Sequence, residues 1–285
     1  MKLTCEKSKL TEAVSKVQIA TSSSSLPALE GIFFECKDGY LTLTGYNLEM
    51  GITTAIDAKT EQNGLVIMSA RYFSEIVRKI PGNIISIETD EKYICTIKSG
   101  ETKFSIIGMP PEEYPDLPTV NAGEGFEIEG NLLCSMIRQT RFAVSKKEDK
   151  PIYNGICFYL KEGIITLAAL DGYRLAKRVE KIEGGKLEEC NFVVPGSTLT
   201  DIERICTDED DGELEIAVGD KHISFIIGST VVVSRRLEGE FLNYRKSLPT
   251  EFRFTLGVDR AELIRAIDRV SLIVNQKNSS PVRMT

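Results

Sequence analysis

The sequence offers few residues whose type and spacing could support catalysis. Its single histidine, His222, lies in the strand-like segment DKHISF, and no nucleophile or metal ligand stands at a recognisable spacing from it. The acidic run at 208–211 lacks the D-x-D-x-D-G spacing of a calcium loop. No glycine-rich nucleotide-binding motif occurs. We therefore predict a solvated acidic loop and a protein that is not an enzyme and carries no metal or cofactor.

The chemistry that the sequence does support is attraction of phosphate by basic side chains. The net charge of −7 argues against nucleic acid, but the charges are unevenly distributed. The predicted helices hold twelve basic and seven acidic residues, a net charge of +5, within windows 7–17, 71–79, 131–143, 197–206 and 259–270. A basic helix layer over an acidic sheet layer would attract phosphate on one face only. Ordinary solvated helix faces are the alternative, and the charge distribution alone does not decide.

These helices belong to an internal repeat. The first has an apolar face with the helical spacing i, i+3, i+4, i+7, formed by Leu10, Ala13, Val14 and Val17. The same face recurs twice, as Leu133, Met136, Ile137 and Thr140 and as Leu263, Ala266, Ile267 and Val270. Each copy follows a short extended segment, in which Leu3, Phe126 and Leu256 are equivalent. A second helix at 70–80 is matched 125 residues later at 195–205.

The repeat predicts an α+β fold of tandem strand-rich domains with two helices each. Strand-like stretches with glycine turns lie between the helices, and proline-containing tails at 114–118 and 244–249 mark linkers. We expect domains at 1–121 and 122–250, and an incomplete third repeat at 251–285 that is the start of a longer chain. Seven scattered cysteines without a C-x-x-C pair indicate reduced thiols, and the lack of an apolar segment predicts a cytoplasmic protein with no membrane contact.

The chain resembles the family of bacterial DNA polymerase III beta subunits, the beta sliding clamps. The resemblance covers the whole chain and rests on the repeat at about 125 residues, the N-terminal MKLTCEKSKLTEAV, the S-x-L-P-A-L-E-G run ending at Gly31, and the D-G-Y-R-L segment at 171–175. It implies the DNA-clamp fold and a head-to-tail homodimer ring around double-stranded DNA. The implied partners are the polymerase III α subunit, the clamp loader and other proteins with a clamp-binding motif.

The resemblance also implies three groups of site residues. In the family, the D-G-[HY]-R-L segment helps to form a pocket for short peptides of the partner proteins. By position, that pocket would be lined here by Tyr153, Leu170, Gly172, Tyr173, Arg174, Leu175, Leu242, Lys246 and Ser247. The side chains expected to face phosphate are Arg71, Arg138, Arg141, Lys146, Lys147 and Arg204. The apolar residues expected at the dimer interface are Phe104, Leu272 and Ile273.

Departures from the family pattern leave alternatives open. Serines at 22–25 stand where many relatives carry an arginine, and Gly196 and Ser197 replace basic residues, so we expect weaker attraction to DNA. The D-G-Y-R-L segment, taken by itself, could be only a turn between two strands. One alternative function is a repeat-built interaction scaffold without a DNA role. Another is a metal-dependent nuclease that uses the acidic loop at 208–211.

Overall fold

The computed structural model describes residues 1–21, 26–120, 125–147, 149–182, 189–206, 212–249, 251–272 and 282–283. The chain divides into two compact units, Met1–Phe241 and Leu242–Thr285. The acidic run at 208–211 and the serines at 22–25 lie outside the described residues.

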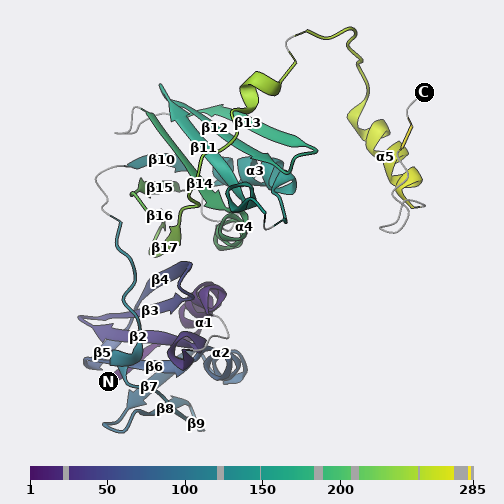
Figure 1. The fold of residues 1–285 in the computed structure, drawn as a ribbon. Coiled ribbons are helices and arrows are strands. Elements are labelled where there is room, and N and C mark those ends of the chain that lie inside the picture. Colours follow the sequence, from purple (N-terminus) through teal and green to yellow (C-terminus); the bar gives the residue numbers. More distant parts are fainter. Residues whose placement is uncertain are drawn as a thin grey trace. The chain divides into compact units, whose positions relative to one another are not determined.

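The larger unit contains two copies of one arrangement of strands and helices (Figure 1). The first copy comprises β1 (Lys2–Glu6), α1 (Lys7–Val17), β2 (Gly31–Lys37), β3 (Tyr40–Tyr46), β4 (Met50–Asp57), β5 (Lys59–Gln62), β6 (Gly64–Ser69), α2 (Ala70–Lys79), β7 (Ile84–Thr89), β8 (Ile94–Ser99) and β9 (Thr102–Ile107). The second comprises β10 (Gly125–Glu129), α3 (Gly130–Thr140), β11 (Gly155–Lys161), β12 (Ile164–Leu170), β13 (Leu175–Lys181), β14 (Glu189–Pro195), α4 (Gly196–Ile205), β15 (Glu213–Val218), β16 (His222–Ile227) and β17 (Thr230–Arg235).

Apart from β5, which pairs with β1 at the edge of the first copy, the described strands have the same order in both copies, as the internal repeat predicts. The run β1-β7-β8-β9 of the first copy has its counterpart in β10-β15-β16-β17 of the second. The run β4-β3-β2-β6 likewise has its counterpart in β13-β12-β11-β14. Each copy therefore builds two antiparallel sheets. The predicted α+β class with strand-rich repeats is confirmed.

A ladder of main-chain hydrogen bonds joins the two copies. Strand β17 pairs antiparallel with β4, from Thr230 opposite Thr54 to Ser234 opposite Met50, and the two half-sheets become one eight-stranded sheet (Figure 1). The side chains of Thr54 and Thr230 are buried, and their hydroxyl oxygens lie 3.0 Å apart in a hydrogen bond. The junction is thus part of the folded core of the larger unit.

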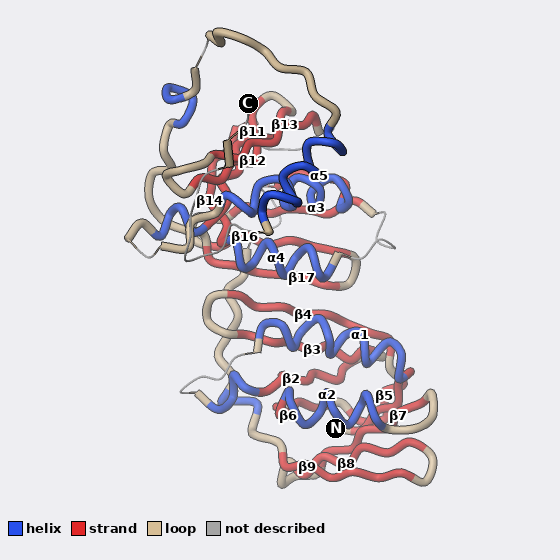
Figure 2. Tube along the Cα trace, turned by 90° about the vertical axis from the view of Figure 1, so that its right-hand side faces the viewer, coloured by secondary structure: helices blue, strands red, loops and turns tan. Residues whose placement is uncertain are grey.

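The helices cover the sheets with the faces that the sequence predicts. In α1 the buried residues are Leu10, Ala13, Val14 and Val17, the set with helical spacing. In α3 the equivalent set is also buried, which confirms the predicted register. Helix α1 contacts α2, α3 contacts α4, and α1, α2 and α4 lie on the same side of the sheets (Figure 2). Burying one large aliphatic side chain contributes about 1.5–3 kcal/mol, so these faces fix the helix layer.

The predicted helix at 131–143 is wrong at its C-terminal end. The α-helix stops at Thr140, and Arg141–Ala143 form the 3-10 turn η4. The Thr140 hydroxyl donates to the Met136 carbonyl at 2.9 Å, and the tighter turn satisfies carbonyl groups left over at the helix end. The first copy ends in the same way, with the 3-10 turn η1 (Gln18–Ala20) after α1.

The smaller unit contains the 3-10 turn η6 (Tyr244–Ser247) and α5 (Arg260–Ser271). The Asp259 carboxylate caps α5 by accepting from the Glu262 amide at 2.8 Å. The predicted apolar face is present but uncovered, because Ile267 and Val270 are 43% and 41% exposed. The described residues 251–259 form no strand, so the extended segment expected around Leu256 is not paired in a sheet. Domain boundaries near 121 and 250 stay predictions.

We predict that the threonine pair at the junction behaves as a unit. Thr54→Val leaves the buried Thr230 hydroxyl without its partner and should cost about 1–3 kcal/mol of the free energy of unfolding. The double variant Thr54→Val/Thr230→Val should recover most of that loss, because both polar groups are then gone. Urea denaturation of the single and double variants measures both values. Additive losses would contradict a direct bond across the junction.

Candidate functional site

The basic side chains predicted to face phosphate are distributed along the helix layer of the larger unit. Arg71 lies on α2, Arg138 on α3, Arg141 on the following turn, and Arg204 on α4. All of them are exposed or half-buried. Their charges are not equally available, because neighbouring carboxylates already engage three of the four.

Glu203 on α4 holds two of these arginines at once. Its Oε1 accepts from Nε of Arg138 at 2.6 Å, and its Oε2 lies 2.8 Å from Nη1 of Arg141. The Glu203 side chain is only 13% exposed, whereas the two arginines are 57% and 41% exposed. The carboxylate therefore lies beneath the guanidinium groups and binds α3 and its 3-10 turn to α4. Sequence reasoning missed Glu203, because nothing in its spacing predicts which residues on another helix it meets.

The remaining predicted phosphate contacts differ in how they are held. Arg204 forms an ion pair with Asp201 one turn earlier, at 3.1 Å, and burial raises the pKa of that aspartate. Arg71 and Lys146 are exposed and form no ion pair with the described residues. Lys147 is also exposed, and its ammonium lies 5.4 Å from the centre of the Tyr173 ring. The loop predicted to reach the DNA backbone is thus in contact with the D-G-Y-R-L segment.

The D-G-Y-R-L segment forms a tight, internally bonded loop between β12 and β13. One carboxylate oxygen of Asp171 accepts from the backbone amides of Tyr173 and Arg174, at 3.0 and 3.1 Å. The other accepts from Nε of Arg174 at 2.9 Å. Gly172 has a φ of +89°, the left-handed backbone that glycine adopts without strain. The loop exposes 88% of Tyr173 and so offers an aromatic ring to a partner.

The hydrogen bonds to Asp171 have an electrostatic consequence. Donation by the Tyr173 amide, then by the amide and guanidinium of Arg174, holds the pKa of Asp171 below its ordinary value of 3.8. The charged carboxylate is therefore the form that builds the loop.

The first repeat carries a structural copy of this loop between β3 and β4. Oδ1 of Asn47 accepts from the amides of Glu49 and Met50, at 3.0 and 2.8 Å. Leu48 has a φ of +72° at the position of Gly172. The two loops therefore share their backbone path and their side-chain hydrogen bonds, although only one has the family's D-G-Y-R-L sequence.

The other residues predicted for the peptide pocket divide between the two units. Leu170 and Leu175 face each other across the hairpin next to the loop. Tyr153 packs edge-on against Phe241, with ring centres 5.7 Å apart. In the smaller unit, Leu242 is 48% exposed and Lys246 is exposed in the turn η6, while the side chain of Ser247 lies outside the description.

Two aromatic residues near this site were not found from the sequence. Phe142 is 55% exposed, and the Arg174 guanidinium lies 5.8 Å from the centre of its ring. Phe241 packs on Tyr153. The repeat could have indicated Phe142, because it stands at the position of Ile19 in the first copy.

The apolar residues predicted for a dimer interface are exposed where they are described. Phe104 on the edge strand β9 is 38% exposed, and Ile107 at the end of the same strand is 82% exposed. Leu272 follows α5 and is 86% exposed. Ile273 lies outside the described residues. In the part of the chain that is described, no helix is both long and apolar enough to cross a membrane.

Comparison with known proteins gives consistent matches along the chain. The family model for the DNA polymerase III beta subunit N-terminal domain matches residues 1–118, and that for the central domain matches residues 127–243. The beta sliding clamp of Bacillus subtilis (strain 168) is 31% identical over 294 residues, which span 100% of this chain and 78% of that protein. A beta sliding clamp of Staphylococcus epidermidis is 28% identical over 270 residues, 92% of this chain and 71% of that protein.

Solved structures agree with these matches. The crystal structure of the DNA polymerase sliding clamp from Bacillus subtilis has a TM-score of 0.93 at 32% identity and covers 97% of this chain and 75% of that chain. A sliding clamp from Bartonella birtlesii, solved bound to griselimycin, has a TM-score of 0.87 at 26% identity and covers 97% of this chain and 76% of that chain.

We predict that the Asp171 loop depends on a side-chain acceptor and, at low pH, on its charge. Asp171→Ala should speed amide hydrogen exchange of Tyr173 and Arg174 by about tenfold, the effect of losing one ordinary hydrogen bond. Asp171→Asn should preserve the loop, because Asn47 makes the same contacts in the first repeat. Nuclear magnetic resonance can follow both amides.

The same amides report the pH dependence. The folded-state pKa of Asp171 is depressed, so the stabilisation should be complete above the ordinary pKa of 3.8 and lost as the pH falls through the lower, folded-state value. Asp171→Asn should remove this transition. A loop that stays equally protected in Asp171→Ala would show that the carboxylate does not build it.

Proposed function

The chain belongs to the DNA polymerase III beta subunit family, the beta sliding clamps, and on that premise we propose that it encircles duplex DNA within a head-to-tail ring. In this role it is a non-catalytic tether that keeps the polymerase on its template. Closure of the ring prevents escape, and weak phosphate attraction permits sliding, so no base needs to be read. We place this activity in the cytoplasm, where the chromosome is replicated.

The pair of open strand edges is the observation that carries the ring proposal. Within the larger unit, β4 of the first repeat pairs with β17 of the second. By strand order, β13 is the second repeat's counterpart of β4, and β9 is the first repeat's counterpart of β17. Both β9 and β13 end their sheets in the described part of the chain. They are therefore two unused halves of a junction whose geometry is already present. We propose that β9 uses this geometry head to tail with the third repeat of the partner subunit, so that the ring closes.

We assign β9 to the contact between protomers. Its backbone groups have no strand on their outer side among the described residues, and it exposes Phe104 and Ile107. A strand of the partner subunit would complete the ladder and cover these side chains, as β4 does for β17. Leu272 and Ile273, which follow α5 in the sequence, are the partner-side residues of this proposal.

The helix layer is the face that we propose for DNA. Arg71, Lys146 and Lys147 are exposed cations that can meet phosphate directly, and Arg138, Arg141 and Arg204 add charge that carboxylates partly offset. A layer of partly neutralised arginines suits a protein that must hold DNA without stopping on it.

We further propose that the loop at 171–175 receives short peptides of the polymerase α subunit, the clamp loader and repair proteins. Its support is the exposed Tyr173 ring, which Lys147 contacts, and the Leu170–Leu175 pair in the adjoining hairpin. The family resemblance assigns Tyr153 and Arg174 to the same pocket. An exposed aromatic ring with a cation beside it suits a peptide with apolar anchors and acidic flanks. Leu242, Lys246 and Ser247 complete the residues assigned to this pocket.

The ring is tested by retention on DNA. The full chain, assembled on nicked circular DNA, should stay bound through gel filtration and should be lost once the circle is cut, because only a closed ring depends on DNA topology. Phe104→Asp/Ile107→Asp at β9 should abolish retention on the circle. The matched control is Ile84→Asp, a similar change at an exposed residue of β7. It should stay bound to the circular DNA. Equal retention on circular and linear DNA would refute the ring and favour an interaction scaffold.

The DNA face is tested at Glu203. Glu203→Gln removes the carboxylate that holds Arg138 and Arg141, so we expect tighter binding of duplex DNA at low salt. The slope of log affinity against log salt should become steeper by about 1 to 2, since each additional phosphate contact contributes about 0.9. Fluorescence anisotropy of a labelled duplex measures the slope.

The matched control is Glu189→Gln. It deletes the same charge from the Lys161 ion pair on the sheet and should leave the slope unchanged. Unchanged or weaker binding by Glu203→Gln would exclude these arginines from the DNA contact.

A further inference from the structure

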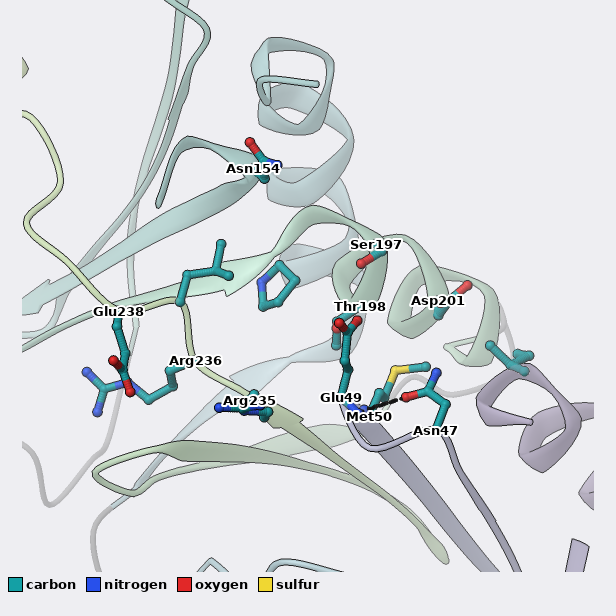
Figure 3. A pocket seen from close by; sticks show the side chains of 13 residues that line it. Asn47, Glu49, Met50, Asn154, Ser197, Thr198, Asp201, Arg235, Arg236 and Glu238 are labelled. Carbon is teal, nitrogen blue, oxygen red and sulfur yellow. Dashed lines mark hydrogen bonds between the residues drawn. The ribbon is translucent and has the colours of Figure 1, made fainter. Parts of the chain in front are cut away.

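A cavity lies at the junction of the two repeats, and the activity proposed above does not use it. It has a volume of about 510 Å³ and is lined by residues of both repeats. On one side lie Asn47, Glu49 and Met50 of the β3–β4 loop, and on the other lie Ser197, Thr198 and Asp201 of α4 (Figure 3). Its size is within the usual range of ligand-binding cavities. We name it the junction cavity.

The loop that borders the junction cavity is the structural copy of the proposed peptide loop. Asn47 takes the place of Asp171, with the same pair of amide donors two and three residues on. The similarity between the two loops extends to the side chains beside each of them. Met50 and Ile19 line the junction cavity, and their counterparts Arg174 and Phe142 stack on each other in the second repeat. The junction cavity is therefore the first-repeat counterpart of the peptide pocket.

The two sites differ in charge. Glu49 stands where the second loop has Tyr173, and Met50 stands where it has Arg174. The lining adds the carboxylates of Asp201 and Glu238.

The cations in the lining do not offset these acids fully. The guanidinium of Arg236 is bound to the carbonyl oxygens of Gly219 and Asn191, at 2.6 and 3.3 Å, so it is not free to meet a ligand. Only Arg235 among the described lining cations is then available. The first loop is acidic and apolar where the second is aromatic and basic.

The walls offer both an apolar seat and polar partners. Aliphatic surface comes from Ile19, Pro195 and Leu237, which are half-buried, with the buried Met50 beneath. Oδ1 of Asn154, on the wall of the cavity, is buried and has no hydrogen-bond partner in the described part of the chain. A buried acceptor without a donor is costly, but this oxygen has almost no solvent-accessible surface, so a ligand in the cavity does not reach it directly. Burial raises the pKa of Asp201, and the Arg204 guanidinium at 3.1 Å offsets that cost only in part.

We propose that the junction cavity is a second peptide site, which binds an extended segment with an aliphatic anchor and basic flanks. The proposal rests on the peptide-binding role proposed for the 171–175 loop, whose backbone the Asn47 loop copies. The anchor occupies the aliphatic wall, and the basic side chains meet Glu49, Asp201 and Glu238. The two loops of one chain then select peptides of opposite charge.

The test uses two labelled, end-capped hexapeptides that share leucine anchors and differ only in carrying lysine or glutamate flanks. Each is titrated into the isotope-labelled full chain to about 1 mM, near the limit of weak specific binding. The lysine peptide should shift the amides of Asn47, Glu49, Ser197 and Arg235. Glu49→Lys should weaken binding of the lysine peptide by about tenfold, because one attraction becomes a repulsion. The control is Glu91→Lys, the same change on an exposed turn far along the sequence. It should not weaken binding of the lysine peptide.

The outcomes separate this proposal from the one on which it rests. Tyr173→Ala should weaken the glutamate peptide and leave the lysine peptide unchanged. A lysine peptide that shifts no junction amides, or that Glu49→Lys does not weaken, overturns the junction site. A glutamate peptide that is indifferent to Tyr173→Ala instead overturns the role of the 171–175 loop. The two results are read from different amides.

Discussion

The arrangement of the chain depends on the antiparallel ladder between β4 and β17. Main-chain hydrogen bonds do not depend on side-chain identity, so a junction made from them can be reused at every point where two repeats meet. The buried threonine pair and the aliphatic layer around it fix the register. The ladder makes one eight-stranded sheet from strands of both repeats. Helices α1 and α2 pack on this sheet, whereas α3 and α4 pack on the separate four-stranded sheet of the second repeat.

The sequence predicted those parts of the fold that follow from local periodicity. The face of Leu10, Ala13, Val14 and Val17 was sufficient to locate α1, since only one helical register buries all four. The repeat then located α3 and α4 from α1 and α2. The end of α3 was misjudged because Arg141–Ala143 continue the apolar pattern in a 3-10 turn, which periodicity cannot tell from a last α-helical turn. Around Leu256 the sequence pattern was not enough to predict the structure, because a strand requires a neighbouring strand to pair with.

The site was predictable in its composition but not in its connections. The basic residues were found by type and by helix, yet the role of Glu203 depends on two helices far apart in sequence, and no spacing rule joins them. The D-G-Y-R-L segment was recognised by its amino-acid sequence. The N-L-E-M segment of the first repeat forms the same loop with a different sequence, so it was not recognised. In both segments, a residue with a side-chain oxygen is followed by a residue in the left-handed conformation. Sequence identity does not reveal this pattern.

Leu48 shows what that shared geometry costs and provides. A left-handed conformation is unfavourable by about 1–2 kcal/mol for a residue with a β-carbon, and Leu48 adopts it with a φ of +72°. The two hydrogen bonds to Asn47 and the burial of Met50 on its far side outweigh that penalty. A loop held in this way is preorganised: it has surrendered its conformational entropy during folding, and a molecule that docks against it does not lose that entropy a second time.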